Sequence, residues 1–300
     1  MSAPLKISVI TPNLNSGQWL DLCIASVADQ EGVGLEHIVQ DALSSDLNLP
    51  WIDRHPAVKL VSERDGGMYD AINRGLKRAG GDILAHLNAD EQYLPGALAA
   101  VMKRFREDAQ LDVLYADTIV VNNEGEPVCC RKSMKPVRLL KYTEFPTITS
   151  SLFFHRRVID EHRLFFDTSY RMVADAIWMR ESVAKKLRTA VLRQYTSAFT
   201  ETGSNLDLSP AAKDESIRLR ESNPAWSKTL GIPLRALSRV RRLLHGTYHQ
   251  KPFSYEIYTH RNLEIRTVFP VEDPTCIWWG RGPREGGRVH RKLKSLFRPK

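Results

Sequence analysis

The sequence predicts an α/β fold, with a mixed, mostly parallel sheet flanked by helices. Two observations lead to this prediction. Short β-branched runs alternate with amphipathic stretches of helical spacing, and each run ends abruptly in polar or acidic residues. The length of 300 residues and the 42% hydrophobic composition suffice for one large domain, or for one domain with an appendage.

The first ninety residues alternate strands with helices. The run from Lys6 to Thr11 is β-branched and predicts a central strand, and the stretch from Trp19 to Val27 has its apolar residues at helical spacing. A helix at 68–79 ends at the pair Gly80-Gly81. Further strands are expected at 37–40, 58–61 and 83–87. Because strands separated by crossover segments pair in parallel, this order favours a largely parallel sheet.

The middle of the chain continues with a mixture of elements. Pro95 stands in the first turn of a helix that reaches Arg106, and the residues 122–125 predict a hairpin turn. We expect strands at 113–121, 127–131, 147–155 and 188–199, and helices at 170–186 and 207–221.

The stretch from Ser62 to Leu94 is the centre of the predicted site. It contains an acidic, glycine-rich loop, a helix, and a strand that ends in Asn88-Ala89-Asp90-Glu91. Asp41, Asp65 and Asp90 all fall at or just after the carboxyl ends of predicted strands. Ligands of open α/β sheets bind beyond those ends, and carboxylates placed there suit a divalent cation and a nucleotide.

The positive charge of the chain belongs to its C-terminal part. Residues 231–300 contain 15 Lys and Arg against 5 Asp and Glu, which gives this segment a charge of +10. Since the net charge of the whole sequence is +8, residues 1–230 carry 8 − 10 = −2. This asymmetry predicts an anionic surface as the partner of the C-terminus. The last twenty residues lack a helical or strand pattern, and we expect them to be mobile.

A basic helix is expected after Pro233. Leu234, Leu237, Val240 and Leu244 mark one face, and Arg235, Arg239, Arg241 and Arg242 lie on the other. Three interpretations stay open: a solvated helix packed on the domain, a helix that contacts anionic lipid head groups, and a nucleic-acid contact. Aromatic residues are not interleaved with the arginines, so the sequence predicts no nucleic-acid partner.

The sequence predicts a cytoplasmic protein. No apolar run approaches the roughly 20 residues of a membrane helix, and the N-terminus enters a strand at once, which leaves no room for a signal peptide. The four cysteines show no metal-ligand spacing and are expected to be reduced.

Five segments in this order resemble the family 2 glycosyltransferases, which are inverting enzymes with the Rossmann-like GT-A fold. They are ITPNLN (10–15), QDALSSD (40–46), SERDGGMYDAINRGLKRAGGDIL (62–84), LNADEQYLPGAL (87–98) and FDTSYRMVADAIWMRE (166–181). The resemblance runs from about Lys6 to Glu221. We therefore expect a GT-A domain at 1–222 and a basic, helical C-terminal extension at 223–300.

The resemblance implies the residue roles. Asp175 would be the general base, and Asp90 would hold a divalent cation, Mn²⁺ or Mg²⁺, that bridges the diphosphate of a nucleotide-sugar. The implied donor-binding residues are Thr11, Pro12, Asn13, Asp41, Glu63, Asp65, Gly67, Asn73, Asn88, Ala89 and Asp90. The implied reaction transfers a sugar, expected from a UDP-sugar, to a hydroxyl of a saccharide or lipid-linked saccharide. Such acceptors make the inner face of the plasma membrane an expected location.

Two departures from the family pattern stand out. Glu91 replaces the more usual second aspartate of the metal segment, and Ala42-Leu43 replace small glycines, which could narrow the base pocket.

Two other functions remain as alternatives. A sugar-nucleotide-forming nucleotidyltransferase would need a basic, glycine-rich loop after the first strand, where this chain has Thr11 to Asn15 without Lys or Arg. A non-catalytic nucleotide-sugar-binding protein would have no need of Asp90 and Asp175.

Overall fold

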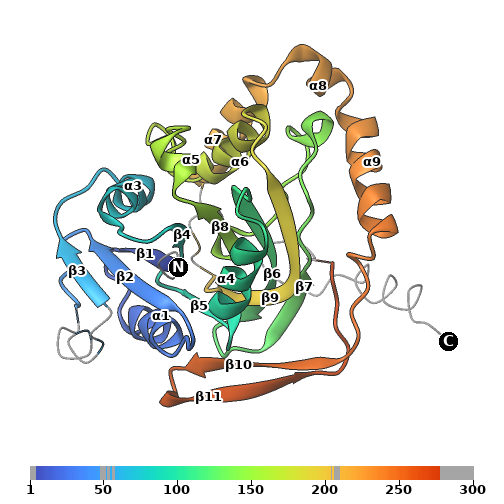
Figure 1. Cartoon of the computed structure of the whole chain (residues 1–300). Helices are drawn as coiled ribbons and strands as arrows, with labels where there is room; N and C mark the ends of the chain where they lie inside the picture. The colour runs from blue at the N-terminus through green and yellow to red at the C-terminus, as the bar shows by residue number, and fades with distance from the viewer. Residues whose placement is uncertain are drawn as a thin grey trace.

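A computed structural model of the chain describes residues 5–47, 52, 55, 58–203, 205 and 210–277. Within these residues, a nine-stranded sheet forms the centre of the molecule (Figure 1). Its strands run in the order β3-β2-β1-β4-β8-β6-β9-β5, and β7 pairs with β6. The predicted α/β class is therefore confirmed.

The N-terminal part of the sheet is parallel. β1 pairs in parallel with β2 on one side and β4 on the other, and β2 pairs in parallel with β3. Helix α1 connects β1 to β2 and helix α3 connects β3 to β4, as the alternating pattern predicts. The elements are β1 (Lys6–Asn13), α1 (Gln18–Ala28), β2 (Gly34–Asp41), β3 (Val58–Ser62), α3 (Met68–Arg78) and β4 (Ile83–His86).

The second part of the sheet mixes directions. β8 pairs antiparallel with both β4 and β6, while β6 and β9 are parallel with a register shift at Ala116 and Asp117. The strands are β5 (Glu91–Tyr93), β6 (Val113–Asn122), β7 (Pro127–Arg131), β8 (Leu152–His155) and β9 (Thr189–Glu201). The helices are α4 (Ala97–Glu107), η1 (Arg138–Leu140), η2 (Thr149–Ser151), α5 (Arg157–Asp160) and α6 (Ala174–Ala184).

Both faces of the sheet are covered by apolar layers. In β4, Leu84 packs with α3 and α6 on one face, whereas Ile83 and Ala85 pack with α1 and α4 on the other. β4 is therefore apolar from Ile83 to Ala85, because successive side chains point into opposite layers.

The turn between α3 and β4 depends on close backbone contact. A Cβ at Gly81 would lie 2.7 Å from the backbone nitrogen of Ser8, and Gly81 N–H donates to Ser8 Oγ at 2.8 Å. Only glycine fits this contact, which brings β4 beside β1 in the correct register.

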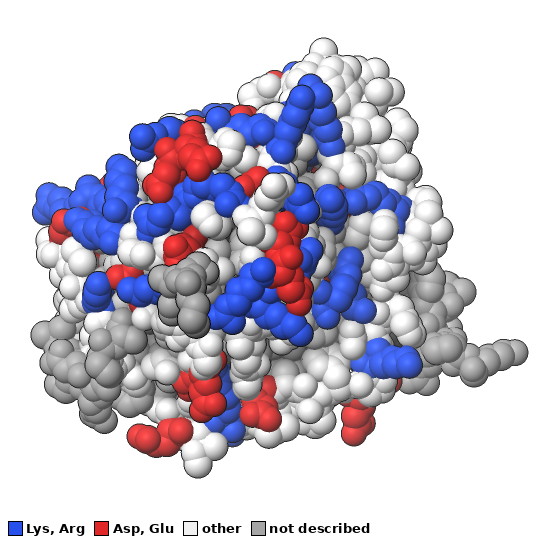
Figure 2. All heavy atoms as spheres, in the orientation of Figure 1, with Lys and Arg blue, Asp and Glu red and all other residues white. Residues whose placement is uncertain are grey.

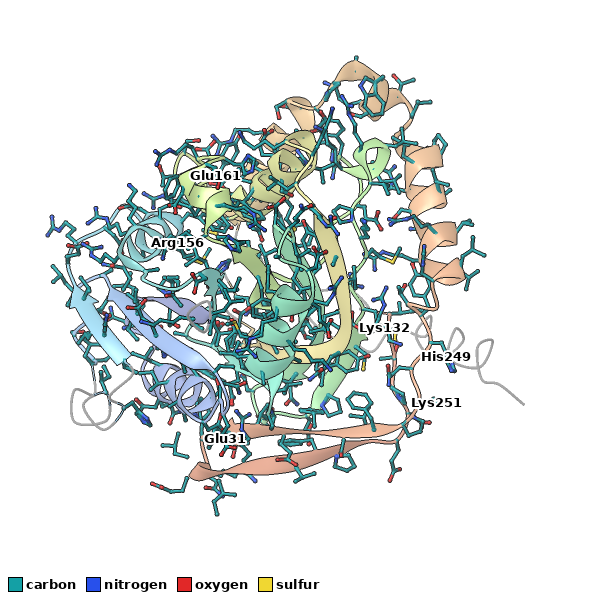
Figure 3. All side chains as sticks on the ribbon, in the orientation of Figure 1. Glu31, Lys132, Arg156, Glu161, His249 and Lys251 are labelled. Carbon is teal, nitrogen blue, oxygen red and sulfur yellow. The ribbon has the colours of Figure 1, made fainter. Side chains whose placement is uncertain are left out.

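The C-terminal part adds three helices and a hairpin. These are α7 (Pro210–Glu221), α8 (Ala225–Thr229), α9 (Gly231–Leu244), β10 (Phe253–Thr259) and β11 (Asn262–Val271). The segment between α9 and β10 lies against the end of β7, where Lys132 Nζ donates to the carbonyl oxygen of His249 at 2.7 Å (Figure 3).

The hairpin fastens the end of the described chain to its beginning. The amide of Gln92 exchanges two hydrogen bonds with the backbone of Tyr258, at 2.8 and 3.0 Å, and Arg266 forms an ion pair with Asp29 at 2.6 Å. The hairpin thus packs on α1 and β5, beside the sheet (Figure 1).

Several details differ from the sequence-based expectations. The short strand β5 (Glu91–Tyr93) was not predicted, and the helix expected to begin at Pro95 begins at Ala97. The hairpin at 253–271 was not predicted. The strand expected at 147–155 begins only at Leu152, because residues 149–151 form a 3-10 turn. The helix expected at 170–186 begins at Ala174.

The prediction of mobility for the last twenty residues lies outside the described part of the chain. Along the part that is described, none of the helices combines the length and the apolar character that a bilayer crossing requires.

Candidate active site

A pocket of about 690 Å³ lies at the carboxyl ends of β1 and β4. Neighbouring parallel strands end at the same edge of a sheet. Here the backbone N–H of Leu87 donates to the carbonyl oxygen of Ile10, and beyond this contact the segments after β1 and β4 form part of the pocket wall. The wall is completed by the loop before α3, the start of α6, the segment 145–149, the residues Thr202 and Asn205, and Arg242 from α9.

Eight of the residues implied by the resemblance line this pocket: Pro12, Asn13, Asp65, Gly67, Asn88, Ala89, Asp90 and Asp175. The remaining four, Thr11, Asp41, Glu63 and Asn73, are not part of the lining. Two of the three aspartates at strand ends, Asp65 and Asp90, therefore share one pocket, and the third supports its wall.

Asp41 is fully buried and holds the wall from inside. Asn13 Nδ2, Ser62 Oγ and the backbone N–H of Ser44 donate to its carboxylate at 2.8, 2.6 and 3.1 Å. Burial acts to raise the pKa of Asp41, but the hydrogen bonds from Ser44, Ser62 and Asn13 outweigh it and lower that pKa. The ionised carboxylate thus fixes the amide of Asn13, which does line the pocket.

The other three residues outside the lining also have partners within the protein, although Glu63 is partly exposed. Thr11 hydrogen-bonds His37 Nε2 at 2.9 Å, and Glu63 pairs with Arg74 and Arg78 at 3.1 and 2.9 Å. Asn73 bonds both backbone groups of Phe166, at 2.7 and 2.9 Å. The contacts of Glu63 and Asn73 position α3 and its loop, whereas the Thr11 contact joins β1 to β2.

Leu43 does not narrow the pocket. Its backbone is left-handed, with φ of 62°, a conformation that favours glycine. The side chain is exposed, and of the pair only Ala42 is part of the lining. The departure from glycine therefore strains the backbone without filling the site.

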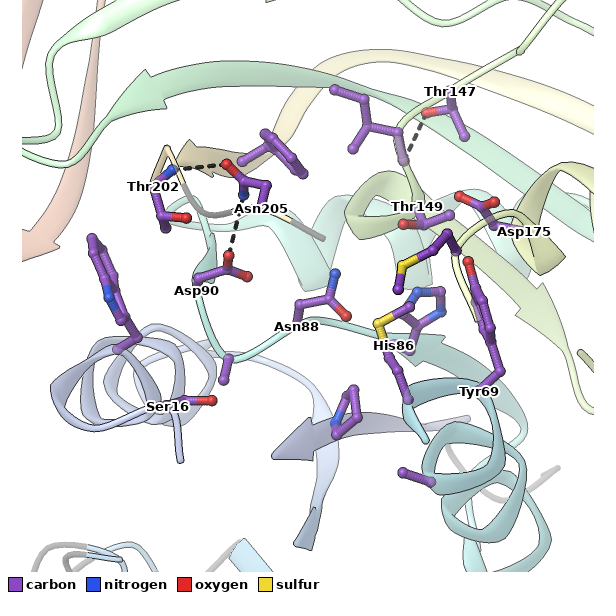
Figure 4. A pocket seen from close by; sticks show the side chains of 18 of the residues that line it. Ser16, Tyr69, His86, Asn88, Asp90, Thr147, Thr149, Asp175, Thr202 and Asn205 are labelled. Atoms are coloured by element: carbon purple, nitrogen blue, oxygen red, sulfur yellow. Dashed lines mark hydrogen bonds between the residues drawn. The ribbon is translucent and has the colours of Figure 1, made fainter. Parts of the chain in front are cut away.

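Asp90 faces the pocket, whereas Glu91 faces away from it. Glu91 is fully buried, and its Oε2 accepts the N–H of Asn88 at 2.8 Å, which shapes the turn after β4. Asp90 Oδ2 accepts a hydrogen bond from Asn205 at 3.4 Å (Figure 4). Burial raises the pKa of Asp90, and burial together with the charge of Asp90 raises that of Glu91.

The surroundings of Asp90 fit a divalent cation that is shared with a ligand. Asn88 Oδ1 also belongs to the turn and is a buried oxygen without a hydrogen-bond partner. The described residues contain no group of three His, Cys, Asp or Glu side chains that could hold a metal by themselves. Mg²⁺ and similar cations are often held by one or two protein oxygens together with substrate phosphates.

Asp175 lies across the pocket from Asp90 (Figure 4). It stands in the first turn of α6, where Ala176 N–H donates to its Oδ1 at 2.7 Å. Burial raises its pKa to about 6, although hydrogen bonds from Ala176 and the Tyr69 hydroxyl act in the opposite direction. A partly desolvated carboxylate of this kind is a stronger base than an exposed one and is still mostly ionised at neutral pH.

The approach to α6 is fixed by a residue that the sequence did not single out. Glu215 of α7 is buried and accepts the backbone N–H groups of Arg171 and Met172 at 2.8 to 3.1 Å. Glu215 therefore holds the segment that leads into Asp175.

Sequence reasoning also missed a cationic part of the lining. Arg131, Lys132 and Arg242 line the pocket, and they come from the end of β7 and from α9. Arg242 donates to the carbonyl oxygens of Lys132 and Phe145 at 3.4 and 3.1 Å. No local motif marks these residues, because tertiary packing alone brings α9 to the pocket.

A pocket at the carboxyl ends of the strands of an α/β sheet is the usual place for a ligand in this class of protein. The model of the family "Glycosyl transferase family 2" matches residues 8–164, which is more than half of the chain, and the chain belongs to this family.

Curated relatives match a shorter stretch. A PGL/p-HBAD biosynthesis glycosyltransferase of Mycobacterium bovis is 34% identical over 126 residues, which cover 40% of this chain and 49% of the relative. A chondroitin synthase of Pasteurella multocida is 28% identical over 123 residues, covering 40% of this chain and 13% of the synthase. The matched stretch thus spans half or less of these relatives.

Solved structures share the fold over most of the chain. S. aureus TarS 1–349 in complex with UDP superposes with a TM-score of 0.56 at 20% identity, covering 82% of this chain and 76% of TarS. The mannosyltransferase PcManGT from Pyrobaculum calidifontis, in complex with GDP-Man and Mn²⁺, gives 0.52 at 18% identity, covering 82% and 77%. These likenesses confirm the GT-A fold.

Proposed function

We propose that the protein is an inverting glycosyltransferase that transfers a sugar from a UDP-sugar to a hydroxyl group of a saccharide or lipid-linked saccharide. The observation that carries this proposal is the pair of carboxylates in one pocket: Asp90 on one side, next to an unpartnered buried oxygen, and the desolvated Asp175 on the other. Their separation suits two different tasks in a single displacement.

Asp90 and Asn88 would hold Mn²⁺ or Mg²⁺ together with the donor diphosphate. The cation would neutralise the charge of the leaving diphosphate. Pro12, Asn13 and Asp65 would contact the nucleoside, and the buried Asp41 would act through Asn13 as a positioning residue. TarS structures in complex with UDP and UDP-GlcNAc support a uridine nucleotide for this chain.

Asp175 would take the proton of the acceptor hydroxyl as the new glycosidic bond forms. The Tyr69 hydroxyl and Ala176 N–H fix the orientation of its carboxylate. Because the acceptor attacks from the side opposite the leaving diphosphate, one displacement inverts the configuration at the anomeric carbon.

The names of the relatives support the proposed acceptor and setting. Two are synthases of the polysaccharides chondroitin and hyaluronan, which supports a saccharide hydroxyl as the acceptor. We propose polysaccharide or cell-envelope assembly on the cytoplasmic side of the membrane. We also propose residues 1–222 as the catalytic domain and 223–300 as its extension.

The first experiment compares Asp175→Asn with the unchanged protein. Calorimetry with UDP and Mn²⁺ should give equal affinities, because Asp175 lies across the pocket from Asp90. UDP release from a panel of UDP-sugars with saccharide acceptors should fall about 10²- to 10⁴-fold, the usual contribution of a general base.

The exposed Asp214 on α7 supplies the matched control, and Asp214→Asn should leave both measurements unchanged. Unchanged UDP release in Asp175→Asn would remove that residue from the mechanism. Release of pyrophosphate from a nucleoside triphosphate and a sugar phosphate would instead support the nucleotidyltransferase alternative.

A further inference from the structure

Helix α9 is attached to the body of the protein by its arginines. Arg241 Nη1 pairs with Glu144 at 2.9 Å, and Arg242 Nη2 donates to Phe145 O at 3.1 Å. Leu234 and Ser238 are buried on the same side. Two of the four arginines that the sequence places opposite the leucines therefore point inward.

The opposite side of α9 is apolar and exposed. Helical spacing places Ile232, Leu237, Val240, Leu243 and Leu244 in one stripe, which we call the apolar face of α9. Their exposed fractions are 75, 45, 52, 65 and 81%. Single exposed apolar residues are common on soluble proteins, but a continuous helical stripe marks a surface that contacts something apolar.

Positive charge borders this face. Arg235 and Arg239 are exposed and follow the stripe along one edge of the helix. Residues 281–300 add eight Lys and Arg against one Glu in the sequence. In Figure 2 the right-hand edge, where α9 lies in Figure 1, is mostly uncharged, and lysine and arginine side chains gather beside it.

This combination selects one class of partner. A second copy of the chain would bring two basic surfaces together, whereas an anionic lipid surface offers phosphates to the arginines and acyl chains to the leucines. We propose that the apolar face of α9 inserts into the head-group region of an anionic membrane, with Arg235 and Arg239 at the level of the lipid phosphates.

The position of α9 connects this surface to the pocket. Arg242 lines the pocket from the helix whose outer side carries the apolar face. A docked α9 therefore keeps the pocket close to the lipid surface. The docking itself does not depend on the proposed sugar transfer. Only the idea that docking brings a lipid-linked acceptor near the pocket rests on that function.

The test is co-sedimentation of the full chain with vesicles. The unchanged protein should sediment with vesicles of phosphatidylcholine and phosphatidylglycerol, and much less with phosphatidylcholine alone. The triple variant Val240→Gln, Leu243→Gln, Leu244→Gln keeps helix-forming residues and should lose binding about tenfold or more, because each of these side chains no longer enters the lipid. Arg235→Glu with Arg239→Glu should weaken binding to the anionic vesicles selectively.

A matched control uses apolar residues that are exposed elsewhere. Ile265 and Val268 of β11 are 68 and 57% exposed, and their replacement by Gln should leave vesicle binding unchanged. UDP and Mn²⁺ affinity by calorimetry, together with the urea midpoint, verifies that the triple variant is folded. These readouts also separate a failure of the docking proposal from a failure of the proposed function.

Three results would overturn the proposal. The triple variant could sediment like the unchanged protein, which would assign binding to the basic tail alone. Binding could be equal on neutral vesicles. Finally, the unchanged protein could fail to bind vesicles and be dimeric by light scattering, while the triple variant is monomeric. The apolar face would then be a contact between copies.

Discussion

Replacing Asp175 by Asn should stabilise the protein while it slows transfer about 10²- to 10⁴-fold. Asn has nearly the same shape, and its Oδ1 can still accept the N–H of Ala176. What disappears is the cost of keeping a carboxylate charge in a partly desolvated place. Since burial is the main cause of the raised pKa, the folded state resists ionisation of Asp175.

The magnitude follows from the two pKa values. The carboxyl group titrates at about 3.9 in an unfolded chain and at about 6 in the folded protein. One pKa unit corresponds to about 1.4 kcal/mol, which gives an upper bound of about 3 kcal/mol. Because the side chain is only partly buried, we expect about 1 to 3 kcal/mol.

The direction of the pKa shift of Asp175 determines the pH range in which the stability difference appears. Below about pH 4, Asp175 is protonated in both states, so the charge costs nothing. Between about pH 4 and pH 6 it ionises in the unfolded chain first, which favours unfolding. The advantage of Asp175→Asn should therefore be complete above pH 6 and vanish as the pH falls towards 4.

The assay is urea unfolding followed by tryptophan fluorescence, at several pH values from 5 to 8. Asp214→Asn, on the exposed side of α7, is the control and should change little at any pH. A stability difference for Asp175→Asn that is constant over this range, or that has the opposite sign at pH 8, would refute the assignment of a desolvated carboxylate.

Three further predictions concern the metal, the base and the sheet. Asp90→Ala should lose most of the Mn²⁺-dependent part of UDP binding. If calorimetry gave the unchanged protein the same UDP affinity with and without Mn²⁺, the assignment of Asp90 as a metal-binding residue would be contradicted. The rate of UDP release should fall at acidic pH with an apparent pKa near 6, since Asp175 must be ionised to act as the base. Tyr69→Phe should shift this fall to higher pH, because it removes a hydrogen bond that favours the charged form of Asp175. Gly81→Ala should destabilise the fold by about 1 to 3 kcal/mol in urea unfolding, because the new methyl group would meet the backbone of Ser8 at 2.7 Å; an unchanged midpoint would argue against this contact.

The sheet and the position of the pocket were predictable because they depend on local patterns. Apolar runs identified β1 and β4, and parallel pairing then required their carboxyl ends to meet. The role of Asp41 was harder to foresee. Whether a side chain at a strand end faces the ligand or the interior depends on its hydrogen-bond partners, here Asn13 and Ser62, and these are distant in the sequence.

The C-terminal part was predicted less well. The periodicity of α9 marks an apolar stripe, but it does not say which side packs on the protein. Glu144 decides this by pairing with Arg241, about a hundred residues further along the chain. The cationic lining by Arg131 and Arg242 follows from the same packing and leaves no local signal.

The hairpin that fastens Tyr258 and Arg266 to α1 and β5 affects how the molecule is made. Leu22 and Ala25 of α1 share a buried cluster with Tyr258, a residue that is synthesised more than two hundred positions later. Until Tyr258 has been synthesised, Leu22 and Ala25 of α1 lack this packing partner. The nascent chain therefore completes this buried cluster only after Tyr258 has been synthesised, and release before that point would expose an apolar surface that chaperones recognise.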